Sequence, residues 1–271
     1  MAATGTGGGT DGDGARAPSP SPSPVPWLRG VVAHRGTPRL HRDNTVAGIE
    51  AAVRLGAAAV EADVRLTADG VPVLHHDPAL PWRPGRPRTP VATLGFDALR
   101  RRAEHVPTLT QALAAARGSG VPLVLDIGTI ETARACLEAL TASPAARSQD
   151  AACPTWFCGA PGALAWIRSQ QPHRPLLLSW ERREPPPATL VDDVRPTMFN
   201  PRHRVVTPAL VEHWHGRGVG VCTWTVDCSW RRARMLRWGV DAVISNDVVG
   251  AVRDARRAGL RRPGPPGTMC A

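Results

Sequence analysis

Short apolar runs alternate with stretches of helical periodicity along most of the chain. The runs with the length of a buried strand are residues 30–33, 58–64, 121–127, 155–158, 176–179, 197–199, 219–226 and 242–245. Helical periodicity lies between most of them, over residues 45–55, 109–116, 130–140, 162–169, 208–217 and 229–238. The helix boundaries carry typical capping residues, namely Thr45, Thr207 and Ser229 as N-caps and Gly56, Gly118, Gly218 and Gly239 at the C-terminal ends.

Repeated strand–helix units of this kind predict a single α/β domain, a (β/α)₈ TIM barrel, over residues 28–258. A doubly wound open sheet is the alternative. It is disfavoured because no glycine-rich phosphate fingerprint follows the first strand. Residues 1–27 are rich in Gly, Ser and Pro and predict a disordered tail, and residues 259–271 predict a flexible C-terminal tail.

Composition narrows the class of protein. Of 271 residues 42% are hydrophobic, which suffices for a full core, yet no run approaches the roughly 20 apolar residues of a membrane-spanning helix. No secretory signal is recognisable, and the six cysteines lack CxxC spacing, so we expect reduced thiols in a cytoplasmic protein. The net charge of +10 comes from arginines spread along the chain. A dense group of arginines near the C-terminus is therefore also expected to form a solvated surface rather than a nucleic-acid-binding arm. It consists of Arg253, Arg256, Arg257, Arg261 and Arg262.

Carboxylates interrupt the apolar strands near their C-terminal ends, where reactive residues of such barrels lie. Glu61 and Asp63 are two residues apart on one strand, so both point to the same face, and Asp126 is in phase with them on the next. Clustered carboxylates require a neutralising cation, and a divalent metal such as Mg²⁺ or Ca²⁺ prefers oxygen ligands. The alternative is an arginine–carboxylate network with Arg35 or Arg65 as the partner.

Two histidines are candidate proton carriers. His34 ends the first strand, and His76 follows a short extended segment that returns to the same mouth. Two imidazoles beside a phosphate group could serve as acid and base near neutral pH. His75 points to the opposite side and is the weaker candidate.

Several strings in this order resemble the glycerophosphodiester phosphodiesterase family over residues 31–250. They are Ala33-His34-Arg35-Gly36, Asp43-Asn44-Thr45, Ala59-Val60-Glu61-Ala62-Asp63-Val64, Asp69-Gly70-Val71-Pro72-Val73, His76-Asp77, Pro107-Thr108-Leu109, Asn200-Pro201 and Thr223-Trp224-Thr225-Val226. The resemblance implies a TIM barrel that uses a divalent metal to hydrolyse glycerophosphodiesters to glycerol 3-phosphate and an alcohol.

The resemblance also implies roles for particular residues. His34 and His76 match catalytic histidines, Arg35 a phosphate-binding arginine, and Trp224 an aromatic residue of the substrate pocket, although a core position for Trp224 is an equal alternative. Glu61, Asp63 and Asp126 match metal ligands.

Two positions depart from the family's pattern. Asp126-Ile127-Gly128 stands where the family has Glu-Ile-Lys, and Ser245-Asn246-Asp247-Val248 where it commonly has Thr-Asp-x-Pro. Either an arginine (Arg35, Arg39, Arg65 or Arg202) reaches into the gap at Gly128, or turnover is slower than in relatives.

Three other functions remain open at this point. The first is a barrel of the same family that binds a phosphate ligand with reduced or lost turnover. The second is a related phospholipase that acts on lysolipids. The third, a nucleic-acid binder, is disfavoured by the scattered arginines. We therefore expect a small-molecule glycerophosphodiester as the partner, with no nucleic acid and no stable membrane insertion.

Overall fold

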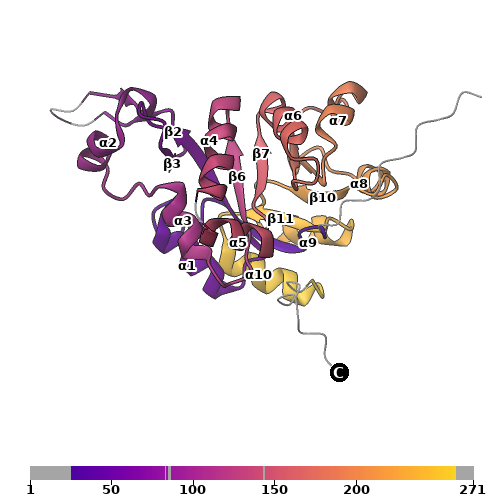
Figure 1. Cartoon of the computed structure of the whole chain (residues 1–271). Coiled ribbons are helices and arrows are strands. Elements are labelled where there is room, and N and C mark those ends of the chain that lie inside the picture. The colour runs from indigo at the N-terminus through magenta and orange to yellow at the C-terminus, as the bar shows by residue number, and fades with distance from the viewer. Residues whose placement is uncertain (1–25, 83, 85–86, 143, 261–271) are drawn as a thin grey trace, which may run out of the picture.

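Eight parallel strands form a barrel in the computed structural model, which describes residues 26–82, 84, 87–142 and 144–260 (Figure 1). The strands are β1 (Gly30–Ala33), β2 (Ala59–Leu66), β6 (Leu123–Ile127), β7 (Trp156–Gly159), β8 (Leu177–Trp180), β9 (Met198–Pro201), β10 (Gly220–Thr223) and β11 (Ala242–Ser245). Their order around the barrel is β7-β6-β2-β1-β11-β10-β9-β8. A parallel bridge between Phe157 and Leu176 joins β7 to the start of β8. The predicted TIM barrel is confirmed, whereas the predictions for residues 1–25 and 261–271 lie outside the described residues.

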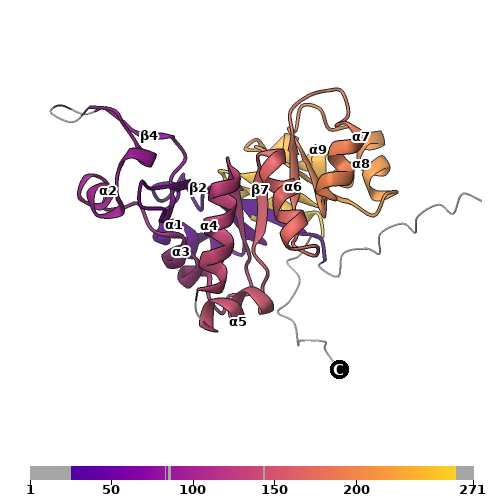
Figure 2. The same ribbon diagram turned by 45° about the horizontal axis from the view of Figure 1, so that its top comes forward.

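Helices connect successive strands and cover the outside of the barrel (Figures 1 and 2). They are α1 (Val46–Leu55), α3 (Leu109–Ala116), α4 (Ile130–Thr141), α5 (Pro144–Ala152), α6 (Pro161–Gln170), α7 (Ala188–Val194), α8 (Pro208–His215), α9 (Ser229–Arg237) and α10 (Val248–Arg257). The sequence analysis did not predict α5, α7 or α10. The buried residues of α10 include Val248, Ala251, Val252 and Ala255, an apolar stripe at helical spacing that a closer examination of the pattern would have found.

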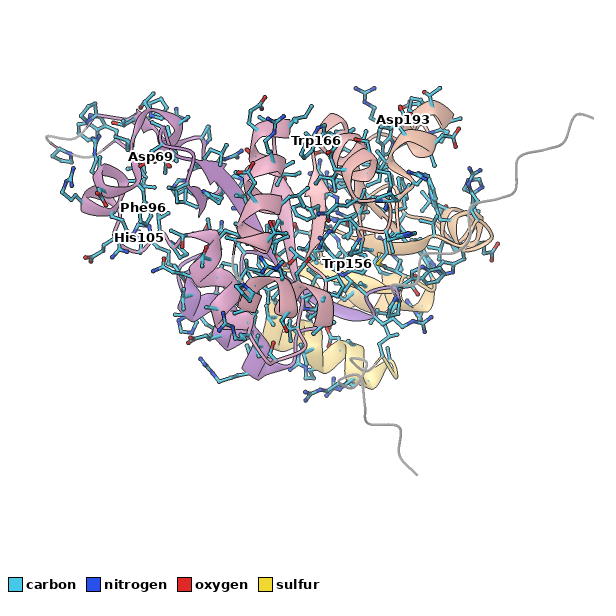
Figure 3. All side chains as sticks on the ribbon, viewed as in Figure 1. Asp69, Phe96, His105, Trp156, Trp166 and Asp193 are labelled. Carbon is cyan, nitrogen blue, oxygen red and sulfur yellow. The ribbon has the colours of Figure 1, made fainter. Side chains whose placement is uncertain are left out.

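Two apolar layers lie on the two faces of the strands. Val60, Ala62 and Val64 pack outward against the helices, in one large cluster of buried residues. A second cluster fills the barrel interior and includes Val124 and Trp156, the latter near the centre of Figure 3. The alternation along β2 therefore places Glu61 and Asp63 on the inward face, as their spacing predicted.

An insertion between β2 and α3 has a small apolar core of its own. It contains β3 (Pro72–Leu74), β4 (Ala79–Leu80), β5 (Thr89–Pro90), η1 (Val91–Thr93) and α2 (Phe96–Arg102), and it projects to the left of the barrel in Figures 1 and 2. Strand β3 pairs antiparallel with β2, so the segment before His76 returns to the barrel mouth. Asp69 accepts hydrogen bonds from the backbone N–H of Phe96 and so caps the start of α2; both residues are labelled in Figure 3.

Capping residues confirm some of the expected helix boundaries. The C-cap residues of α3, α8 and α9 are Arg117, Gly216 and Trp238, so Gly118 and Gly239 lie one residue, and Gly218 two residues, beyond the C-cap positions. The hydroxyls of Thr45 and Thr207 accept N-terminal backbone N–H groups, and Gly56 ends α1 in the left-handed conformation, with φ 88°. Ser229 was predicted as an N-cap, and this is wrong. Cys228 occupies the N-cap position of α9, and the Ser229 hydroxyl instead donates to the carboxylate of Asp254.

A buried arginine holds the end of α7 to α6. The three side-chain nitrogens of Arg168 donate to backbone carbonyls of Pro172, Val194 and Arg195 at 2.6, 2.9 and 2.8 Å, respectively. Burial lowers the pKa of Arg168 to about 10, so the guanidinium remains charged near neutral pH. Its charge satisfies carbonyls that the end of α7 would otherwise leave without donors.

We predict that Arg168→Leu lowers the free energy of unfolding by about 2–4 kcal/mol, because it leaves buried carbonyl oxygens without donors. Arg134→Leu is the matched control, since Arg134 is exposed and lies only over the Trp166 ring, with its guanidinium carbon 5.7 Å from the ring centroid. Its loss should be below about 1 kcal/mol. Urea unfolding measures both variants, and equal losses would contradict the role assigned to Arg168.

Candidate active site

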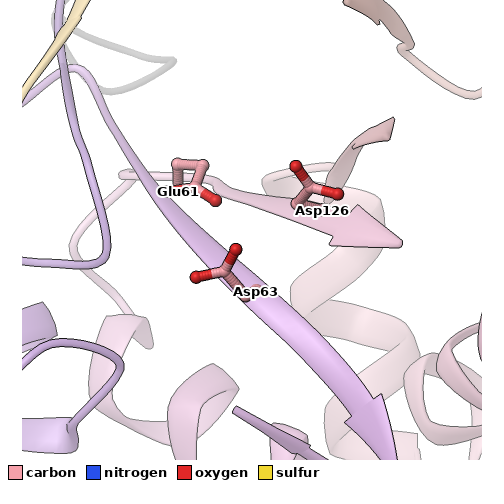
Figure 4. A group of neighbouring side chains, drawn as sticks. All are labelled: Glu61, Asp63 and Asp126. Carbon is pink, nitrogen blue, oxygen red and sulfur yellow. The ribbon is translucent and has the colours of Figure 1, made fainter. Parts of the chain in front are cut away.

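Three carboxylates meet at the C-terminal ends of two neighbouring strands (Figure 4). Asp63 on β2 lies opposite Asp126 on β6 in the sheet register, and Glu61 precedes Asp63 by two residues. One oxygen of each carboxylate lies within 4.8 Å of one oxygen of the other two. Glu61 and Asp63 are only 4% and 8% exposed. The arrangement is therefore a buried concentration of negative charge that faces the barrel interior.

Burial and repulsion by neighbouring carboxylates disfavour the charged forms of Glu61 and Asp126. Burial is the largest cause that raises the pKa of Glu61 well above its usual range, and the charges of Asp63 and Asp126 raise it further. Burial and the charge of Asp63 also raise the pKa of Asp126, although Arg65 opposes the shift. A donor set made only of carboxylate oxygens fits a hard divalent cation, which would remove this repulsion.

The loop after β1 supplies most of the protein groups that offset the negative charge of the three carboxylates. The backbone N–H of Arg35 donates to Glu61 Oε2 at 2.9 Å, and Arg35 Nε lies 3.1 Å from Asp63 Oδ2. The Asn44 side chain binds Asp63 twice, donating to its carboxylate at 2.8 Å and accepting from its backbone N–H at 3.0 Å. Arg35 pairs with Asp63, and the charge of Arg65 acts on Asp126, so both arginines of the alternative network are present, but two guanidiniums do not neutralise three carboxylates.

Both Arg35 and Asn44 adopt left-handed backbone conformations, with φ of 53° and 54°. Asn44 was not predicted as a site residue. Its signal was available in the string Asp43-Asn44-Thr45, because asparagine tolerates the left-handed region better than most residues.

His34 is mostly buried beside the cluster. Its Nδ1 lies 2.7 Å from Asn246 Oδ1, and its Nε2 lies 3.8 Å from Glu61 Oε2. Burial lowers the pKa of His34 below its usual value, although the hydrogen bond with Asn246 opposes this shift. The ring is therefore neutral at physiological pH, with Nε2 on the side of Glu61.

His76 approaches from the insertion and is more exposed. Its Nδ1 lies 2.8 Å from Asp77 Oδ1, and this hydrogen bond is the largest cause that lowers the pKa of Asp77. The neighbouring His75 is held by the backbone carbonyl of Asp77 instead.

One hollow of about 390 Å³ brings all the predicted site residues together. It is lined by His34, Arg35, Glu61, Asp63, His76, Asp126 and Trp224, whereas His75 does not line it. Trp224 is half-buried at its wall and donates its indole N–H to the backbone carbonyl of Asn200 at 3.0 Å. Asn200, which was not predicted, also lines the hollow, and its Oδ1 has no hydrogen-bond partner among the described residues.

The gap at Gly128 contains an arginine. Gly128 lines the hollow, and a Cβ placed on it would lie 3.4 Å from Nη1 of Arg65. The same guanidinium donates to the backbone carbonyl of His76 through Nε and Nη2. Arg65 thus lies where the family's pattern has a lysine, and it connects β2 to the loop that carries His76.

A TIM barrel with these groups at its mouth has the chemistry of a phosphate-ester hydrolase. Residues 34–249 match the model of the glycerophosphoryl diester phosphodiesterase family, and the chain belongs to that family. The family and enzyme class predicted from the sequence strings are confirmed.

Two known proteins with similar sequences are named glycerophosphodiester phosphodiesterases. A glycerophosphodiester phosphodiesterase of Caldanaerobacter subterraneus subsp. tengcongensis is 24% identical over 242 residues, which cover 84% of this chain and 98% of that protein. Glycerophosphodiester phosphodiesterase 1 of Bos taurus is 34% identical over 110 residues, but these cover only 35% of this chain and 33% of that protein.

Solved structures share the fold. An Oleispira antarctica phosphodiesterase, in complex with the product sn-glycerol-3-phosphate, superposes with a TM-score of 0.74 at 21% identity, covering 85% of this chain and 97% of that one. A glycerophosphodiester phosphodiesterase of Thermotoga maritima gives a TM-score of 0.68 at 19% identity, covering 84% and 99%.

In the part of the chain that the structure describes, no helix has the length and apolar character needed to cross a membrane.

The raised pKa of Glu61 predicts how the stability of the metal-free protein depends on pH. A carboxyl group whose pKa is higher in the folded than in the unfolded state takes up a proton on folding. The free energy of unfolding therefore falls as pH rises from the unfolded pKa, about 4.3, through the raised folded value. The metal-free protein should lose stability between mildly acidic and neutral pH.

Glu61→Gln should reduce that loss, so that the metal-free variant melts at a higher temperature than the parent at neutral pH. Mg²⁺ should raise the melting temperature of the parent but not of the variant. Scanning calorimetry with and without chelator tests both statements, with exposed Glu138→Gln as the control. A metal-induced rise in Glu61→Gln equal to that of the parent would contradict the site.

A lysine at position 128 would compete with Arg65. Its side chain must pass the guanidinium that lies 3.4 Å from its Cβ, and the two positive charges would repel each other. We therefore expect Gly128→Lys to lower kcat/KM for phosphodiester hydrolysis by about tenfold, since the displaced Arg65 would also release the loop of His76. Gly128→Ala is the control, because its Cβ makes only an ordinary contact with Arg65. The double variant Arg65→Met with Gly128→Lys should recover activity, because the new lysine then has no positive neighbour to repel it. Faster turnover in Gly128→Lys alone would show that the gap lacks a cation.

Proposed function

We propose that this chain is a metal-dependent hydrolase that cleaves glycerophosphodiesters to glycerol 3-phosphate and an alcohol, a reaction of glycerophospholipid metabolism. The observation that carries the proposal is the single hollow that joins two histidines, Arg35 and three carboxylates, two of them buried, in a chain of this family. The product named for the Oleispira antarctica relative supports glycerol 3-phosphate as one product.

A divalent cation on Glu61, Asp63 and Asp126, Mg²⁺ or Ca²⁺ by the chemistry of its ligands, would supply positive charge to a phosphate oxygen. Arg35, at the rim of the same cluster, binds the phosphate and stabilises the negative charge that grows on it during cleavage. Arg65 adds a second positive charge beside Gly128, a residue that lines the hollow.

The two histidines have different surroundings, which suit different roles. His34 is neutral and buried, so its Nε2 is available to accept a proton from the attacking water, whose oxygen bonds to phosphorus as the bond to the alcohol breaks. His76 lines the same hollow, and its ring is held through Nδ1, which lies 2.8 Å from Asp77 Oδ1. His76 therefore donates the proton to the departing alcohol.

The polar wall of the hollow suits a glycerol group. Asn200 Oδ1 is buried without a partner among the described residues, and a glycerol hydroxyl would supply the missing donor while the indole of Trp224 covers the carbon chain. A second hollow of about 280 Å³ shares Arg35 and His76 with the first, and it is the place for the departing alcohol.

One assay separates this function from its rivals. Glycerol 3-phosphate release from glycerophosphocholine and glycerophosphoethanolamine is measured with the full chain, before and after metal removal by EDTA and after return of Mg²⁺, Ca²⁺ or Mn²⁺. Faster cleavage of lysolipid in the same assay would indicate the related phospholipase. Calorimetric binding of substrate without any product would indicate a binding protein without turnover.

His34→Ala and His76→Ala should each lower kcat by roughly 10²–10⁴-fold, the usual effect of removing a catalytic acid or base. His173→Ala is the matched control because His173 is exposed and lines neither hollow, and the variant should retain activity within about threefold. Steady-state kinetics on glycerophosphocholine measure these effects. An essential His75 with a dispensable His76 would reverse the assignment.

A further inference from the structure

Two residues from separate loops form a hydrogen-bonded chain behind His34. Asn246 follows β11 directly, and its Oδ1 lies 2.7 Å from His34 Nδ1. Asp227, in the loop after β10, accepts from the side-chain Nδ2 and the backbone N–H of Asn246, both at 2.8 Å. The hydroxyl of Ser245 also donates to Asp227, at 3.0 Å. Neither Asp227 nor Asn246 has a place in the proposed function so far.

The chemistry of these groups permits only one arrangement of protons. An ionised carboxylate only accepts hydrogen bonds, so the amide of Asn246 must turn its NH₂ group toward Asp227. Its carbonyl oxygen must then face His34. Because the carbonyl oxygen of Asn246 can only accept a hydrogen bond, His34 Nδ1 must carry a proton and donate it. A neutral imidazole has one N–H, so Nε2 then carries the free lone pair. Nε2 is the nitrogen on the side of Glu61, 3.8 Å from its Oε2.

We infer that Asp227 and Asn246 are positioning residues: Asp227 fixes the orientation of the Asn246 amide, and Asn246 holds His34 as the Nδ1–H tautomer with Nε2 open to the hollow. The catalytic consequence rests on the proposed function, whereas the tautomer itself does not. The inference also accounts for the departure at Asn246. The family's pattern has a carboxylate at position 246. In this chain the carboxylate belongs to Asp227, which contacts His34 through the Asn246 side chain and not directly.

The test exchanges the two side chains. In Asn246→Asp alone, two carboxylates would meet where a 2.8 Å hydrogen bond now lies, and they would repel each other. In Asp227→Asn alone, the new amide offers a donor, so the Asn246 amide can turn over and present its NH₂ group to His34, which favours the other tautomer. In the double variant Asp227→Asn with Asn246→Asp, the donor and acceptor are exchanged, and the carboxylate introduced at position 246 still accepts from His34 Nδ1.

Each single variant should lower kcat by about 10–100-fold with little change in KM, and the double variant should return to within about threefold of the parent. Asp247→Asn is the matched control. Asp247 is the next residue and pairs with the buried Arg232 at 3.1 Å, but it does not touch His34. Its loss should lower the melting temperature while kcat is retained, which separates a catalytic effect from a loss of stability.

The ring nitrogens of His34 provide a readout that needs no turnover. With ¹⁵N-labelled histidine at mildly alkaline pH, His34 should show a protonated Nδ1 in the parent and in the double variant, and not in Asp227→Asn. A parent protein with this tautomer but no hydrolysis would refute the proposed function alone. A protonated Nε2 in the parent, or a double variant no more active than Asn246→Asp, would overturn the inference.

Discussion

Three carboxylates inside one barrel mouth impose the constraint on which the rest of the site depends. Burying like charges within 4.8 Å of one another is unfavourable unless donors and cations surround them. The loop after β1 provides these groups through the backbone of Arg35, its guanidinium and the amide of Asn44. To reach the carboxylates, the loop adopts two left-handed residues, which cost about 1–3 kcal/mol each and persist because the hydrogen bonds hold them. The conformation that presents Arg35 and His34 to a substrate is therefore set by the carboxylates beneath them.

Much of this site was predictable because it follows from periodicity within single strands. Residues two apart on a strand share a face, so Glu61 and Asp63 had to point inward together. Asp126 joins them because β6 is the next barrel strand in the chain and pairs in parallel with β2. The barrel itself followed from the alternation of strands and helices. Two of the missed helices have a weak apolar signal: none of the described side chains of α5 is buried, and in α7 only Val194 is. Helix α10 was missed although it carries a clear apolar stripe.

The interactions that the sequence could not predict join side chains from loops far apart in the chain. Asp227 reaches Asn246 across 19 residues, and Asn246 reaches His34 across 212. No local pattern encodes such a pairing, because it exists only once β1, β10 and β11 lie side by side. Arg65 is an intermediate case. It is two residues after Asp63 and thus shares its face, but that spacing could not show that its guanidinium turns toward Gly128 and not toward solvent.

At both positions where the chain departs from the family's pattern, a charged side chain is missing and another residue nearby carries a charge of the same sign. At Gly128 a missing positive charge is replaced by Arg65 from the neighbouring strand, and at Asn246 a missing negative charge is replaced by Asp227 from the neighbouring loop. Because Coulomb interactions depend on the position of a charge and not on the residue that carries it, the exchanges keep a positive charge beside residue 128 and a negative charge beside residue 246. Arg65 contacts the backbone of His76, and Asp227 contacts His34 through Asn246. A binding protein without turnover would need neither contact with a catalytic histidine. The paired exchanges therefore favour an active enzyme over a binding protein built on the same fold.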